Sequence, residues 1–246
     1  MPGTKIGKDI AQSKSIMARA NLFRTDIFPY HVINRSNNKE WFYIPDENLW
    51  SIFVDKLQSC SETYGAEIHT FVLMSNHFHL LISTPKRNLD AIMCYLQREV
   101  CRAIQRECGR VNHIFGGRYR WSVLGNSHAV AYTYKYICRN PVRAGIVDQA
   151  WRYPYSSFSQ LCNESCEIPI SDGLGSLWTA IPKNWEERTA WIDTPTSKEL
   201  EALISGALRR THYKFSESNE KQKLIRKLRK EYGVELHCPP SGPGSE

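Results

Sequence analysis

Short apolar stretches bounded by turn residues alternate, along the first 160 residues, with longer stretches whose apolar residues recur at helical spacing. The short stretches predict strands over residues 28–34, 67–74, 77–83 and 116–124, although the two middle ones also fit a single bent strand. The longer stretches predict helices over residues 46–64, 88–109 and 126–139. Strands separated by helices, with adjoining strands able to pair as hairpins, favour an α+β fold in which helices cover an antiparallel sheet.

The composition of the chain changes after Phe158. Residues 161–195 are loop-like or rich in Trp, Pro and charge, which predicts a linker between a domain over residues 23–160 and a C-terminal extension. Thr196 and Glu199 have the spacing of a capping box, so we expect the extension, residues 196–238, to be mostly helical. It is also basic, because residues 221–230 contain six Lys or Arg and no acidic residue. A flexible leader is expected over residues 1–22 and a disordered tail over residues 239–246.

Composition excludes several classes of protein. No stretch of the 246 residues approaches the roughly 18 uninterrupted apolar residues of a membrane span, and the first residues lack the apolar block of a secretory signal. We therefore expect a cytoplasmic protein without a membrane partner. Eight cysteines without a CxxC pair argue against a zinc ribbon and against a compact disulfide scaffold.

Positive charge is concentrated in one part of the chain, whose formal net charge is +7 overall. Residues 86–143 contain eleven Lys or Arg against three Asp or Glu, a net charge of +8. Phosphate contacts supply most of the nonspecific affinity of proteins for nucleic acids, so this segment favours a polyanionic substrate. A solvated basic face explains the same charge and stays an alternative.

His77 and His79 occupy alternate positions of one predicted strand. Successive side chains of a strand point to opposite faces, so both imidazoles emerge on one side while Phe78, Leu80 and Ile82 face the other. Two imidazoles on one face can share a divalent cation if a third group approaches from elsewhere in the fold. The alternative is a pair of surface histidines on a half-buried strand.

Tyr136 and Asn140 are four residues apart at the end of the third predicted helix, hence on one face. Asn140 can complete a metal site with the two histidines, and Tyr136 then lies beside a phosphate that the metal polarises. A tyrosine that attacks a phosphodiester conserves its energy as a phosphotyrosine ester, so the cut strand can be rejoined elsewhere without ATP. Tyr132 shares this face but has no Asn four positions ahead, and Tyr134 projects elsewhere, so we expect core packing for both.

These residues resemble the single-tyrosine HUH transposases, and within them the REP-associated tyrosine transposases of bacteria. The resemblance covers approximately residues 30–158 and rests on four motifs together: Tyr30-His-Val-Ile-Asn-Arg35, Met74-Ser-Asn-His-Phe-His-Leu-Leu81, Tyr136-Ile-Cys-Arg-Asn-Pro-Val-Arg-Ala-Gly145 and Tyr153-Pro-Tyr-Ser-Ser157. It implies a ferredoxin-like antiparallel sheet, the HUH endonuclease core, that requires Mg²⁺ or Mn²⁺. In that family the histidine pair binds the metal, the tyrosine upstream of Asn-Pro is the nucleophile, and a polar residue four positions further on is a third ligand. These roles correspond to His77 and His79, to Tyr136 and to Asn140.

We therefore predict a metal-dependent endonuclease and strand transferase, associated with the nucleoid and acting as a monomer or a homodimer. It is expected to cut and rejoin single-stranded DNA near hairpin repeats through a 5′-phosphotyrosine intermediate on Tyr136. Arginines can fork to phosphate or stack on unpaired bases, so the expected DNA contacts are Arg35, Arg118, Arg120, Arg139 and Arg143, followed by Arg98 and Arg102. A noncatalytic, domesticated protein that binds hairpin DNA explains the basic segment equally well. A hydrolase of small phosphoesters explains the histidines but not the pairing of Tyr136 with Asn140.

Overall fold

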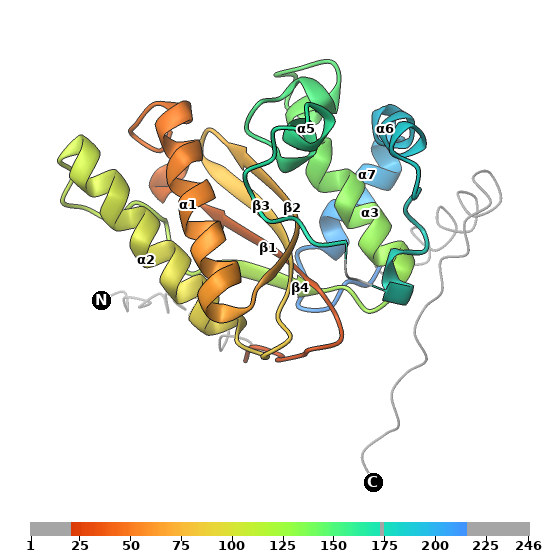
Figure 1. The fold of residues 1–246 in the computed structure, drawn as a ribbon, viewed down its shortest axis with the longest axis horizontal. Coiled ribbons are helices and arrows are strands. Elements are labelled where there is room, and N and C mark those ends of the chain that lie inside the picture. The colour runs from red at the N-terminus through yellow and green to blue at the C-terminus, as the bar shows by residue number, and fades with distance from the viewer. Residues whose placement is uncertain (1–20, 173–174, 216–246) are drawn as a thin grey trace, which may run out of the picture.

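The computed structural model describes residues 21–172 and 175–215, and they form an antiparallel sheet with helices on both faces (Figure 1). Its four strands are β1 (Tyr30–Arg35), β2 (Glu67–Met74), β3 (His77–Ser83) and β4 (Arg120–Val123). The strand order is β2-β3-β1-β4, so β1 and β3 are central. The predicted hairpin of two strands joined by Ser75-Asn76 is confirmed, and the predicted fourth strand is shorter than expected.

Two helices cover one face of this sheet. Helix α1 (Asp46–Tyr64) joins β1 to β2, and α2 (Leu89–Cys108) joins β3 to β4. The resulting β-α-β-β-α-β order is that of the ferredoxin-like fold. The apolar stripes of both helices pack in one core with the alternate β3 residues Phe78, Leu80 and Ile82. The predicted α+β, ferredoxin-like class is therefore confirmed.

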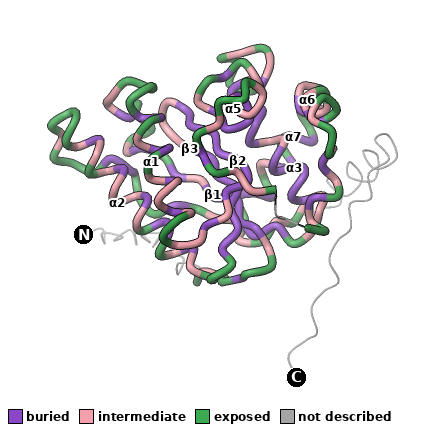
Figure 2. Tube along the Cα trace, in the orientation of Figure 1, coloured by how far each residue is buried: buried purple, intermediate pink, exposed green. Residues whose placement is uncertain are grey.

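The remaining helices lie on the other face, where Figure 2 shows a second band of buried residues along α3. Helix α3 (Ser127–Cys138) packs against β2 and β3. It is followed by α4 (Asn140–Arg143), α5 (Ser157–Cys162), α6 (Trp185–Asp193) and α7 (Lys198–Ala207). Three short 3₁₀ turns complete the described chain: η1 (Asn37–Lys39), η2 (Ala150–Arg152) and η3 (Gly175–Trp178). None of the helices that the structure describes is long and apolar enough to cross a membrane.

Residues expected to form a linker pack against α3 instead. Trp178, Ile181 and Ile192, all within the expected linker 161–195, are buried in the second core. Helix α7 begins after Ser197, whose Oγ accepts a hydrogen bond from the backbone N–H of Leu200 at 3.2 Å, one residue later than the capping box predicts. The leader up to residue 20, the basic run 221–230 and the tail lie outside the described residues, so the domain boundaries stay a prediction.

Candidate active site

The sheet face that α3 covers presents the two histidines of β3. In the antiparallel register His77 lies opposite Arg35 and His79 opposite Ile33 of β1, so these side chains share one face. Phe78 between them packs in the core on the other face. The structure therefore shows the alternation that the sequence predicts.

His31 of β1 adds a third imidazole to this face of the sheet. Its Nε2 lies 2.8 Å from Nδ1 of His79, and the two rings stack with centroids 5.1 Å apart. Because this contact uses Nδ1 of His79, Nε2 is the nitrogen left to bind a cation, which requires Nδ1 to be protonated and to donate to His31. Sequence reasoning missed His31, although its spacing from Arg35 on β1 puts both on the histidine face.

The tautomer of His77 follows from its neighbours. Its Nδ1 lies 2.7 Å from Oδ1 of Asn76, and Nδ2 of Asn76 donates to the carbonyl of Lys39 at 2.8 Å, which fixes which end of the amide is oxygen. An amide oxygen only accepts, so Nδ1 of His77 carries the proton. Its Nε2 therefore has a free lone pair, as a metal ligand needs.

Burial keeps all three imidazoles neutral. It lowers the pKa of His31 to about 3, with the charge of Arg120 as a second cause. Burial, and then the charge of Arg35, lowers the pKa of His77 to about 4. Burial also holds the pKa of His79 well below its ordinary value, and the two neighbouring histidines lower it further. The neutral ring is the form of histidine that binds metal ions.

Tyr136 of α3 lies against this group. Its ring centroid is 5.8 Å from that of His79 and 6.4 Å from that of His31, edge-on in both cases. The start of α3 is fixed by Asn126, whose Oδ1 accepts from the backbone N–H of Ala129 at 2.8 Å. Sheet and helix thus bring the predicted phenol and the imidazoles together within one chain.

The two other tyrosines of α3 have different surroundings. Tyr134 is fully buried and packs edge-on against Trp178 at 5.3 Å. Tyr132 packs edge-on against Phe215 at 6.4 Å. Burial raises the pKa of Tyr132 to about 12, which disfavours the ionised form that a nucleophile needs.

Asn140 is the first residue of α4, separated from the end of α3 by Arg139, and is 8% exposed. Its Nδ2 donates to the backbone carbonyl of Tyr136 at 2.9 Å, so its amide oxygen is the atom that can face a cation. Among the described residues, no group of three or more His, Cys, Asp or Glu could hold a metal ion. A metal site here would need a ligand of another type, such as the amide oxygen of Asn140, besides the nitrogens of His77 and His79, and the neutral rings fit that use.

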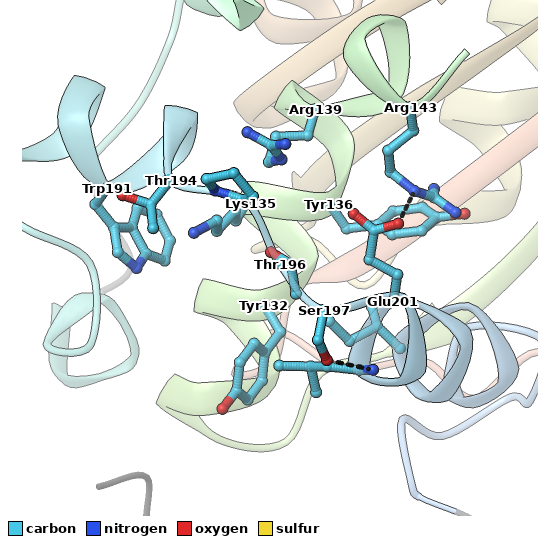
Figure 3. A pocket seen from close by; sticks show the side chains of 13 residues that line it. Tyr132, Lys135, Tyr136, Arg139, Arg143, Trp191, Thr194, Thr196, Ser197 and Glu201 are labelled. Atoms are coloured by element: carbon cyan, nitrogen blue, oxygen red, sulfur yellow. Dashed lines mark hydrogen bonds and ion pairs between the residues drawn. The ribbon is translucent and has the colours of Figure 1, made fainter. Parts of the chain in front are cut away.

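Arg143 of α4 covers the ring of Tyr136. Its guanidinium carbon lies 4.5 Å from the ring centroid, and its Nε lies 3.1 Å from Oε2 of Glu201 on α7 (Figure 3). Sequence reasoning missed Glu201, because it is 58 residues from Arg143 and belongs to no motif. The C-terminal extension therefore reaches the arginine that covers the candidate nucleophile.

Three predicted DNA contacts share one surface hollow. Arg35, Arg118 and Arg120 line it together with Lys39, and no acidic side chain is among its described lining residues. The register places Arg35 and Arg120 on the histidine face of the sheet. Gly116 lets the neighbouring loop approach the end of β1, since a Cβ there would lie only 3.2 Å from the carbonyl oxygen of Ser36. We call this surface the cationic hollow.

The other predicted arginine contacts have partners within the protein. Arg139 is buried, and its guanidinium donates two hydrogen bonds of 2.9 Å to backbone carbonyls at the end of α6. Arg98 and Arg102 both pair with Glu99 on α2, which covers the face of the sheet opposite the histidines. A contact of any of these arginines with DNA stays a prediction.

Part of the chain is similar in sequence to a known family of proteins. Residues 26–140 match the model of a family described as "Transposase IS200 like". This segment of the chain is therefore similar to the IS200-like transposases.

Two further comparisons point to one group of transposases. A curated protein of Haemophilus influenzae, named "Putative REP-associated tyrosine transposase", is 29% identical over 112 residues, which are 41% of this chain and 63% of that protein. The chain thus spans less than two thirds of the relative's length. The solved structure of a REP-associated tyrosine transposase bound to a REP hairpin matches with a TM-score of 0.50 at 17% identity, over 63% of this chain and 93% of that one. The likeness to this solved structure supports the assignment of the fold.

Proposed function

We propose that the protein is a metal-dependent nuclease and strand transferase that cuts and rejoins single-stranded DNA near hairpin repeats. The observation on which this rests is the convergence of the Tyr136 ring on the rings of His79 and His31, at 5.8 and 6.4 Å. The likeness of residues 26–140 to the IS200-like transposases supports DNA as the substrate. The hairpin bound in the solved relative supports a hairpin-bearing strand as its form.

In this proposal His77, His79 and Asn140 hold Mg²⁺ or Mn²⁺. The cation, when bound, withdraws charge from the scissile phosphate and orients it for in-line attack. His31 holds His79 in the orientation and tautomer that leave Nε2 free. The cationic hollow binds the phosphates of the same strand.

Tyr136 is the proposed nucleophile. Its phenolic oxygen forms a bond to the phosphorus and loses its proton, while the bond from phosphorus to the 3′ oxygen breaks and that oxygen gains a proton. The products are a 5′-phosphotyrosine ester and a free 3′ hydroxyl. Attack by the 3′ hydroxyl of another end reverses the exchange, so the strand is rejoined and Tyr136 is released.

Covalent capture tests this proposal. The full chain, incubated with hairpin-bearing single-stranded oligonucleotides and Mg²⁺ or Mn²⁺, should form an adduct that survives denaturing electrophoresis. We expect Tyr136→Phe to abolish the adduct, because the attacking oxygen is lost. The matched control Tyr95→Phe, on α2 at the opposite face of the sheet, should retain it. No adduct from the wild type with either metal, or an undiminished adduct from Tyr136→Phe, would reject the mechanism.

A noncatalytic protein that binds hairpin DNA is the second candidate. The observation in its favour is the cationic hollow, which requires no cleavage chemistry to bind a strand. Hairpin binding that persists in the presence of a chelator, together with no adduct under any metal condition, would favour this candidate.

A further inference from the structure

A pocket of about 250 Å³ lies between α3 and residues 191–204, which run from α6 into α7 (Figure 3). Tyr136 forms part of its wall, so the pocket adjoins the candidate active site. Its opposite walls come from Trp191 of α6, from the connection between α6 and α7, and from α7 itself. These outer walls lie beyond residues 26–140, which match the family model.

The pocket is lined by more positive than negative charge. Its lining includes Lys135, Arg139 and Arg143 but a single carboxylate, Glu201, and that carboxylate is paired with Arg143. Arg139 is 7% exposed, and its Nε has no hydrogen-bond partner among the described residues. A buried guanidinium N–H without a partner is uncommon, and a bound water or anion is one explanation for it.

Lys135 is a second cation of this pocket that a bound anion would stabilise. Its Nζ lies 5.2 Å from the centroid of the Trp191 ring. Burial, and then the charge of Arg139, lowers the pKa of Lys135 to about 8, although Asp193 and Glu201 oppose this. A negative group between Lys135 and Arg139 would offset both effects.

The remaining lining is aromatic and apolar. Trp191 and Tyr132 border the same space as the two cations (Figure 3). Aromatic faces stack on any nucleobase, and cations bind phosphate, so this combination is typical of sites for single-stranded nucleic acid.

We propose that this pocket binds one unpaired nucleotide of the strand that Tyr136 attacks, with a phosphate at Lys135 beside the Arg139 guanidinium and the base against Trp191 and Tyr132. The inference rests on the proposed function, because it names the place where that function holds its substrate. It gives the C-terminal extension a part in substrate binding.

The binding test uses the full chain with Tyr136→Phe, so that no cleavage occurs, and a fluorescein-labelled DNA hairpin with a single-stranded flank on each side. We expect Trp191→Leu to raise the Kd by about fivefold or more, the effect of losing one stacked base, while Trp191→Phe largely restores affinity. Trp41→Leu is the matched control, because Trp41 is 76% exposed and lies outside the pocket. Lys135→Gln should reduce the slope of log affinity against log salt by about 0.7, and the surface change Lys183→Gln should leave it unchanged.

Photo-crosslinking locates the nucleotide. The same hairpin carries 5-iododeoxyuridine at one flank position at a time, and the crosslinked peptides should contain Trp191 or Tyr132. Free 5-iododeoxyuridine monophosphate, tested alongside, should crosslink there far less than the strand. Crosslinks only outside the pocket, crosslinks there only from the free nucleotide, or affinities of Trp191→Leu and Lys135→Gln equal to those of their controls would overturn the inference.

These results separate the two proposals. Pocket crosslinks without any adduct from the wild type reject the proposed cleavage but keep the pocket as a nucleotide site. An adduct from the wild type without pocket crosslinks keeps the cleavage and rejects the pocket.

Discussion

His31 is 2% exposed, and its Nε2 contacts Nδ1 of His79 at 2.8 Å. Its own Nδ1 is buried with no hydrogen-bond partner among the described residues. The contact with His79 through Nε2 is therefore the polar contact that the His31 ring makes. A contact of this kind holds a ligand histidine in one tautomer and one orientation. His31 is therefore a positioning residue for the proposed metal site.

We expect His31→Phe to weaken the binding of Mn²⁺ by about 10- to 100-fold, because His79 loses the partner that orients it. Isothermal titration of the full chain with Mn²⁺ measures this. His113→Phe, a change at an exposed histidine away from the sheet, should leave the affinity unchanged. Equal affinities of the His31→Phe variant and the wild type would show that His31 does not act on the ligand.

Residues differ in how well the sequence predicts their roles. The shared face of His77 and His79 could be predicted, because strand geometry fixes the direction of alternate side chains. The contact of His31 with His79 could not, because it depends on the register of β1 against β3. A charge pattern likewise cannot tell that Arg139 is buried against α6 while Arg120 is exposed.

At the scale of elements, α3 joins the ferredoxin-like core to the C-terminal extension. One side of α3 packs on the sheet, and another contacts α7 and η3. Arg139, in the junction between α3 and α4, binds the last carbonyls of α6, which have no partner within that helix. This arginine therefore fastens α6 to α3.

We expect Arg139→Leu to lower the free energy of unfolding by about 2 to 3 kcal/mol, because two hydrogen bonds from a buried charged group are lost. Urea denaturation measures the change. The control Arg152→Leu removes a half-exposed ion pair with Asp148 and should cost less than about 1 kcal/mol. A loss for Arg139→Leu no larger than that of the control would mean that the contact does not fasten α6.

The long helices could be predicted and the short ones could not. α1 and α2 show several turns of apolar spacing, and each ends at a glycine with φ of 68°, at Gly65 and Gly109. α6 has nine residues, of which Arg188 and Ile192 are buried. So short a stretch, with an arginine on its buried side, shows no helical period, and its place against α3 follows from tertiary contacts.

At the scale of the molecule, the sheet separates two cores, and the second one encloses a further histidine. His69 of β2 is 1% exposed, with Nδ1 2.6 Å from the carbonyl oxygen of Ser171 and Nε2 2.8 Å from Oγ of Ser83. Burial lowers its pKa to about 4, although the hydrogen bond to Ser171 opposes this. His69 thus joins the two β-strands β2 and β3 to the segment after α5.

Because the unfolded chain binds a proton at His69 near pH 6.5 and the folded chain only near pH 4, acid favours unfolding. The stabilisation is fully present above pH 6.5 and is lost as the pH falls toward 4, by on the order of 3 kcal/mol. Denaturation across this range should give a shallower dependence on pH for His69→Gln than for the wild type. The exposed control His113→Gln should keep the wild-type dependence, and equal slopes for all three would contradict the prediction.

Because β1 and β3 are the central strands, local opening of the structure affects the imidazoles on these strands less than the Tyr136 phenol on α3. Both strands are bonded on each side, so releasing the imidazoles requires the sheet to separate. The phenol instead belongs to the last turn of a helix, where small excursions of the backbone suffice to move it. Local opening at the end of α3 would therefore move the proposed nucleophile, Tyr136, while the imidazoles stay in place, and the proposed site would form again without refolding of the sheet.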